Sequence, residues 1–111
     1  MQEAELEAAT VADYTIREFV DFPGARYEPL DGEAEIAPGI RVVLTPHTPG
    51  HQSVVIETDS GPLVIAGQAL ETVDELHEGG EVAGLLLSLE PTRILFSHDD
   101  RVWQTPAARA V

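Results

Sequence analysis

The stretch "LTPHTPGHQSVVIETDSGPLVIAGQAL", residues 44–70, predicts the centre of the fold. Two apolar runs, "HQSVVIET" and "GPLVIAG", are joined by the turn residues 59–61, and this pattern predicts an antiparallel hairpin. Both runs are nearly continuous in Val, Ile and Leu, which is typical of strands that are buried on both faces. The loop before the hairpin is rich in proline and glycine and carries two histidines, His47 and His51. We therefore expect a buried hairpin with imidazoles presented at its start.

The sequence before this hairpin predicts a helix and two further strands. Residues 2–9 are strong helix formers and predict a terminal helix or the end of a longer one. Turn signals follow at Pro23-Gly24 and Asp31-Gly32. The segment "GEAEIAPGIRVVLTP" then predicts a short strand, a turn at Pro38-Gly39 and a second strand over roughly 40–45.

The sequence after the hairpin predicts two helices and a final strand. "ETVDELHEGG" predicts a short helix that ends at Gly79-Gly80, and "EVAGLLLSLEPT" predicts a second helix that ends before Pro91. "RILFSHDD" predicts one more buried strand that continues into a polar loop. This order predicts an α+β or layered α/β fold, with helices on one side of a mixed sheet.

Length and composition limit the function. The 111 residues suffice for one domain or part of one, and 43% of them are hydrophobic, enough for a core. The formal net charge of −14 repels phosphate, so it excludes nucleic acid and anionic membranes as favoured partners. Cysteine is absent, which excludes disulfides and thiolate ligands. No secretory signal or transmembrane run is visible, so we expect a cytoplasmic protein.

Histidines carry the chemistry that the sequence suggests. His51 precedes a predicted buried strand, where a side chain is either a fixed ligand or a simple turn cap. His47 lies four residues earlier, but Pro46, Pro49 and Gly50 exclude a helical metal-binding pair. His98 is followed by Asp99, which could orient its ring as metal ligands require; the alternative is a surface histidine in an acidic loop. We expect His77 to be simply solvated.

Three motifs together resemble a known family. "HTPGH" with His51, "AGQA" after the next strand, and "LFSHD" with His98 resemble the C-terminal half of the metallo-β-lactamase fold hydrolases. The closest resemblance is to the N-acyl homoserine lactonase-like branch, and it covers nearly all of residues 1–111. It implies half of an αββα sandwich with one or two zinc ions at the sheet edge. It also implies hydrolysis of a lactone or related ester by metal-bound hydroxide.

The resemblance assigns roles residue by residue. His51 and His98 correspond to metal ligands, and His47 and Asp99 are candidates for a supporting layer around them. Gln68 takes the place of an aspartate that bridges two ions, although a neutral amide is a poor bridge. Leu70 and Glu71 follow where this branch commonly has a tyrosine. No catalytic residue is assigned beyond these positions.

The ligand set within the 111 residues is incomplete. The family's His-x-His-x-Asp-His motif is missing from this sequence, and a catalytic zinc needs three protein ligands. We therefore expect weak or no zinc binding by this chain alone, and a truncated or partial enzyme. We also expect marginal stability, self-association or pairing with the missing N-terminal half. Two alternatives stay open: a non-catalytic, degenerate module that associates through an open sheet edge, and a small metal site formed by dimerisation.

Overall fold

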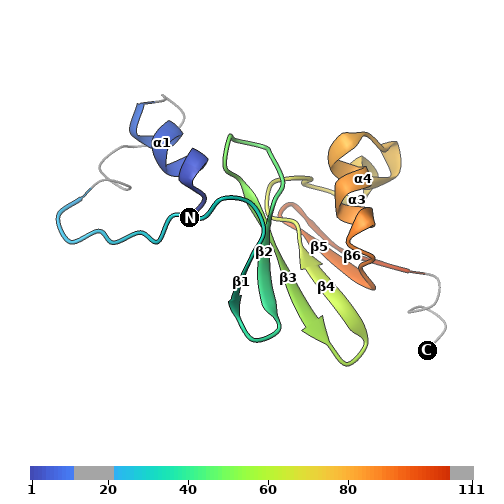
Figure 1. The fold of residues 1–111 in the computed structure, drawn as a ribbon. Helices are drawn as coiled ribbons and strands as arrows, with labels where there is room; N and C mark the ends of the chain where they lie inside the picture. The colour runs from blue at the N-terminus through green and yellow to red at the C-terminus, as the bar shows by residue number, and fades with distance from the viewer. Residues whose placement is uncertain (12–21, 106–111) are drawn as a thin grey trace.

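The computed structural model describes residues 1–11 and 22–105 (Figure 1). Its elements are α1 (Glu3–Val11), β1 (Ala34–Ala37), β2 (Ile40–Leu44), β3 (Gln52–Thr58), β4 (Gly61–Ile65), α3 (Val73–Glu78), α4 (Glu81–Ser88), β5 (Arg93–Phe96) and β6 (Asp99–Gln104). These elements confirm the predicted terminal helix, the first four strands, both later helices and the start of the final strand. Among the described residues, no helix is long and apolar enough to cross a lipid bilayer.

The strands of the described residues form one mixed sheet in the order β1-β2-β3-β4-β5-β6. Neighbouring strands are antiparallel except for β4 and β5, which run parallel. A parallel pair needs a crossover connection, and α3 and α4 provide it (Figure 1). The expectation of a mixed sheet is therefore confirmed.

This topology brings separate loops to one edge of the sheet. Since β3 is antiparallel to both β2 and β4, it begins where those two strands end, and the parallel β5 ends there as well. Hydrogen bonds connect the loops at this edge: the Thr45 amide donates to His51 O at 2.9 Å, and the His98 amide donates to Glu71 O at 3.0 Å. Both histidines predicted to be metal ligands, His51 and His98, therefore lie at this edge.

One face of the sheet carries the core. Val55 is aligned with Val64, and Val64 with Ile94, so these three side chains form a row across the central strands. All three are fully buried, as is Leu86 of α4. They belong to one cluster with Val43, Ala66, Leu76 and Ala83, and the partly buried Phe96 and Trp103 pack against it. Helices α3 and α4 thus cover this face, as predicted.

The prediction that the hairpin strands are buried on both faces is wrong. Burial along β3 alternates instead, with the odd-numbered Ser53 and Val55 buried and the flanking residues only half-buried. At the end of β4, Ile65 is 37% exposed. The reason is that α3 and α4 pack on the side of Ser53 and Val55. On the other side burial is uneven: Val42, aligned with Val54, is 2% exposed, whereas Ile65 is 37% exposed. The continuous apolar sequence therefore leaves an apolar surface.

The predicted polar loop after β5 is also wrong. Residues 99–104 form strand β6, which turns back antiparallel to β5. Trp103 is aligned with Ile94 and packs against the core cluster. The acidic start of this segment concealed the strand, because Asp99 and Asp100 occupy its first two positions and only Val102 and Trp103 contribute apolar area.

The half-covered sheet face generates a prediction about association. Replacing Ile65 with lysine places a charge within the apolar surface and should reduce concentration-dependent self-association, which sedimentation equilibrium measures. The matched control is Leu87→Lys, since Leu87 is 42% exposed on α4 and lies away from that face. Equal association of the unmodified chain and both variants, or a monomer at all concentrations, would contradict this expectation.

Candidate functional site

The loop before β3 is closed at its base by main-chain hydrogen bonds. The Thr45 amide donates to His51 O at 2.9 Å, and the His51 amide donates to Thr48 O at 3.2 Å. Pro46 and Pro49 lie within this loop and restrict its dihedral angles. The position of the His51 main chain is thus fixed before its side chain makes any contact.

The His51 imidazole lies between the ends of two strands. Its Nδ1 is 2.9 Å from Thr45 O at the end of β2 and 3.2 Å from Thr45 Oγ1. Its Nε2 is 3.0 Å from the main-chain nitrogen of Gln68, just after β4. The ring is half-buried. His51 therefore bridges two loops that are 17 residues apart.

Two buried hydroxyls continue this contact into the sheet. Thr45 Oγ1 lies 2.7 Å from Ser53 Oγ, and Ser53 Oγ donates to Ala66 O at 3.0 Å. Both Thr45 and Ser53 are fully buried. Neither residue was predicted from the sequence; the available signal was a serine at an inward position of β3, in phase with Val55. A polar network therefore lies beneath the imidazole.

Gln68 approaches His51 through its main chain. The Gln68 residue is exposed overall, and its amide N–H is the group that reaches the ring. Gly67 precedes it with φ +61°, in the left-handed region that favours glycine, and a Cβ there would lie 2.9 Å from His51 Nε2. Glycine at position 67 thus permits the close approach.

The other predicted histidines are exposed. The His47 ring lies edge-on to the His51 ring, with 5.9 Å between centroids. His98 occupies the turn between β5 and β6, where its main chain bonds to Glu71 O. His77 is exposed on α3, in agreement with the expectation that it is solvated. The structure therefore brings His47 and the Gln68 main chain to His51, while His98 is placed at the same edge by its own turn.

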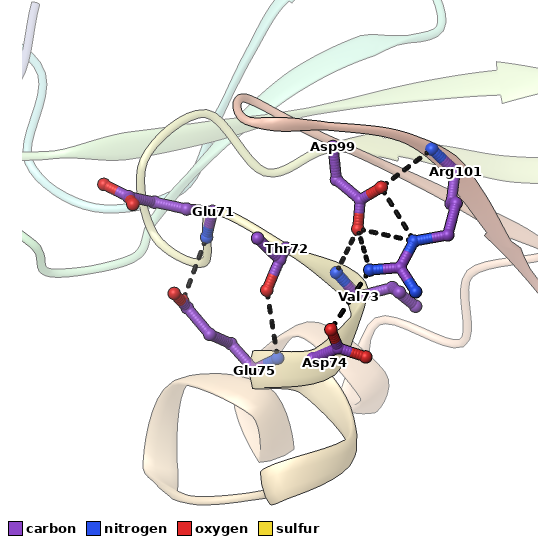
Figure 2. A network of polar contacts seen from close by, with 7 residues as sticks. All are labelled: Glu71, Thr72, Val73, Asp74, Glu75, Asp99 and Arg101. Carbon is purple, nitrogen blue, oxygen red and sulfur yellow. Dashed lines mark hydrogen bonds and ion pairs between the residues drawn. The ribbon is translucent and has the colours of Figure 1, made fainter.

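Asp99 fixes the turn that carries His98 (Figure 2). Its Oδ2 accepts from the Val73 amide at the start of α3 at 2.9 Å, and its carboxylate accepts from the Arg101 guanidinium at 2.8 to 3.1 Å. Arg101 also contacts Asp74 at 3.1 Å. Among the described residues, none of the hydrogen bonds of Asp99 goes to the His98 ring. Asp99 thus connects β6 to α3.

The network of Asp99 shifts its acidity. Hydrogen bonds from the Arg101 side chain, from the Val73 amide and from the Arg101 amide hold the pKa of Asp99 well below its usual range. The same contacts, first with Asp99 and then with Asp74, raise the pKa of Arg101. Figure 2 also shows the start of α3, where Thr72 accepts from the Glu75 amide and Glu75 accepts from the Glu71 amide. The segment between Gln68 and α3 is therefore held at several points.

The N-terminal helix clamps the histidine loop. The Glu5 carboxylate of α1 accepts from Thr48 Oγ1 at 2.5 Å and from the Gly50 amide at 3.3 Å. A Cβ at position 50 would lie 2.3 Å from the Glu5 nitrogen, so the helix contacts the loop because Gly50 lacks a side chain. Gln2, which is fully buried, donates to Gly32 O and accepts from the Gly32 amide. The contacts of these N-terminal residues were not predicted from the sequence.

Comparison with known proteins identifies relatives. No family model matches the sequence. An N-acyl homoserine lactonase from a Bacillus species is 37% identical over 86 residues, which cover 76% of this chain and 34% of that protein. An N-acyl homoserine lactonase from Bacillus cereus is 39% identical over 66 residues, which cover 59% of this chain and 26% of that protein.

Solved structures agree with the sequence relatives. An N-acyl homoserine lactone hydrolase, with the product N-hexanoyl-L-homoserine bound at its catalytic metal centre, matches with TM-score 0.74 and 30% identity. The match covers 89% of this chain and 46% of that one. By sequence and by fold, the chain is similar to one part of the N-acyl homoserine lactonases, and its fold class is that of their metallo-β-lactamase fold structures. A quorum-quenching N-acyl homoserine lactone hydrolase also matches, with TM-score 0.73 and 28% identity over 89% of this chain.

These comparisons confirm the predicted family and fold class. This lactonase-like chain spans about a third of the length of its first curated relatives and about half of the solved structures. The match to the N-acyl homoserine lactonases therefore concerns one part of those proteins.

The described residues of this chain do not by themselves form a metal-binding site. No three or more His, Asp or Glu side chains are grouped closely enough there to hold one. A catalytic zinc takes three protein ligands and keeps one open position. His51 also directs its Nε2 at a main-chain N–H. The ligand roles of His51, His98 and Gln68 therefore stay predictions.

The contact between α1 and the histidine loop can be tested by substitution. Glu5→Ala removes the acceptor for Thr48 Oγ1 and the Gly50 amide, so we expect about 1 kcal/mol less stability. Amide hydrogen exchange at Gly50 should also become faster. Glu3→Ala is the matched control, because Glu3 is an exposed acid on the same helix. Unchanged exchange at Gly50 in Glu5→Ala would show that the clamp does not hold the loop.

The acidity of Asp99 predicts a pH dependence. Because its pKa is lowered in the folded state, ionised Asp99 stabilises the fold fully above the usual carboxyl pKa of about 4. That stabilisation is lost as the pH falls from about 4 through the lowered value, since the unfolded state then binds the proton first. We expect Asp99→Asn to be less stable at neutral pH and to lose less stability on acidification, as measured by urea unfolding.

The neighbouring exposed acid provides the control for this experiment. Asp100→Asn removes the same charge from the same strand at an exposed position and should keep the acid sensitivity of the unmodified chain. If Asp99→Asn and Asp100→Asn respond to acid alike, the network in Figure 2 is not the source of the effect.

Proposed function

We propose that the chain supplies the C-terminal part of a zinc-dependent hydrolase that opens lactones or related esters. The observation that carries this proposal is the match over 89% of the chain to a hydrolase with N-hexanoyl-L-homoserine at its catalytic metal centre. The 37% identity to a Bacillus N-acyl homoserine lactonase supports the same reaction class. These relatives do not favour the alternative of a non-catalytic module.

In this proposal, His51 and His98 act as metal ligands at the sheet edge, and Gln68 takes the bridging position. His51 is suited to this role because both strand ends fix its ring. Asp99 fixes the turn that carries His98 by contacting Val73 and Arg101. The neutral amide of Gln68 favours one ion, or two that are held less tightly.

The remaining ligands must come from residues outside this 111-residue sequence. The half-covered sheet face, with Ile65 at 37% exposure, offers a surface against which the polypeptide that carries them could pack. On its own, the chain would bind zinc weakly or not at all and would associate with copies of itself. The cytoplasmic location expected from the sequence stays a prediction.

Complementation tests this proposal. The chain is mixed with the N-terminal part of a Bacillus N-acyl homoserine lactonase, including its His-x-His-x-Asp-His motif, in buffer with Zn²⁺. Lactone opening releases a carboxylic acid, which a pH indicator follows. We expect hydrolysis by the mixture only, lost on chelation and reduced at least about tenfold by His51→Ala. The matched control is His77→Ala, since His77 is exposed on α3. Activity that is insensitive to His51→Ala, or a stable complex without activity, would contradict the proposal.

A further inference from the structure

The protonation of the His51 ring follows from its partners. A main-chain amide can only donate, so His51 Nε2 must accept the Gln68 N–H, which lies 3.0 Å away. The proton of the neutral imidazole is then on Nδ1, where Thr45 O is an acceptor at 2.9 Å. One tautomer satisfies both contacts, and the contacts come from residues on either side of the ring.

The hydroxyls below the ring agree with this assignment. Ser53 Oγ uses its single hydrogen to donate to Ala66 O, so it must accept from Thr45 Oγ1. Thr45 Oγ1 has then used its own hydrogen and can only accept from His51 Nδ1, at 3.2 Å. Each donor therefore has an acceptor from the imidazole to the carbonyl of Ala66, within a buried part of the sheet.

These contacts join three strands at one edge. Thr45 follows β2, Ser53 lies at the start of β3, and Ala66 and Gln68 follow β4. The His51 ring connects the end of β2 with the residues after β4, since it contacts both Thr45 and Gln68. Loss of the ring would leave the buried Thr45 hydroxyl and the Gln68 amide with one partner fewer.

The same contact covers the nitrogen that a metal would use. A histidine that donates through Nδ1 to a carbonyl binds metals through Nε2. Here the Gln68 N–H occupies that direction, and the main chain at Gly67 is so close that a Cβ would lie 2.9 Å from Nε2. An ion can reach Nε2 only if the peptide between Gly67 and Gln68 moves away.

We infer that in this chain His51 is a structural cross-link between strand ends, with its Nε2 closed to metals by the Gln68 amide. The inference concerns the 111-residue chain without its complement and goes beyond the proposed function. In the complemented enzyme the peptide at Gly67 would turn aside, so hydrolysis by the mixture and a closed Nε2 in the separate chain are independent outcomes.

The unmodified chain provides the first test. Long-range proton–nitrogen NMR spectra of the ¹⁵N-labelled protein report the tautomer of His51, and the Gln68 amide signal reports its hydrogen bond. We expect the Nδ1–H tautomer and no shift of either signal on adding equimolar Zn²⁺. An Nε2–H tautomer, or a stoichiometric Zn²⁺-dependent shift of both signals, would overturn the inference. This test needs no variant to fold.

Substitution provides the second test. His51→Ala should lower the urea midpoint of unfolding by roughly 1 M, with or without chelator, because the buried Thr45 and the Gln68 amide each lose a hydrogen bond. His98→Ala is the matched control, as it removes an exposed imidazole at the same edge and should leave the midpoint unchanged. Equal effects of the two substitutions, or an effect of His51→Ala that appears only with Zn²⁺ present, would overturn the inference.

Discussion

The parallel pairing of β4 with β5 brings the turn that carries His98 to the edge of the sheet where His51 and Gln68 lie. In a purely antiparallel arrangement, β5 would end at the opposite edge of the sheet from β4. The crossover through α3 and α4 reverses that direction, so the residues after both strands lie at the edge where β2 ends and β3 begins. Ligand sites commonly form outside the carboxyl ends of parallel strands. His98, which follows β5, lies at the same edge as His51 and Gln68 for this topological reason.

Burial on one face of the sheet has a second consequence. The row of Val55, Val64 and Ile94 is covered by Leu86 and its neighbours, and it provides the cohesion of the described core. The opposite face is apolar in sequence but only half-buried, with Ile65 at its margin. A chain with this distribution has enough core to define its fold and a remaining apolar surface that favours association. The relatives, which are two to three times longer, have further residues available to cover such a face.

The candidate site combines a fixed geometry with an incomplete ligand set. The His51 ring is held by Thr45 and by Gln68, in the tautomer that a ligand bound through Nε2 also needs. The contacts that orient the ring thus also direct a main-chain amide at Nε2, the nitrogen that we propose as a metal ligand in the complete enzyme. The chain thus shares the fold of the lactonase structures over this length, without a group of metal-binding side chains among its described residues.

The local elements and the resemblance to the lactonase family follow from the sequence alone. Short-range sterics and hydrogen bonds between neighbouring residues specify the turn at residues 59–61 and the end of α3 at Gly79. The spacing of apolar residues along each strand and helix is likewise a local property. The motif around His51 likewise identified the lactonase-like branch, because motif spacing is a property of the chain. Strand β6 was missed, since its burial depends on the contact between Trp103 and the core rather than on its own composition.

The contacts between these elements depend on tertiary packing and could not be predicted from the sequence. The two faces of β3 differ because α3 and α4 pack on one side, which no property of residues 52–58 could indicate. The buried pair of Thr45 and Ser53, and the clamp from Glu5, join residues that are distant in sequence and become neighbours through strand pairing. The proton position on His51 depends on the Gln68 amide, 17 residues away. Short-range interactions specify the helices, strands and turns, and long-range packing determines which of them contact one another.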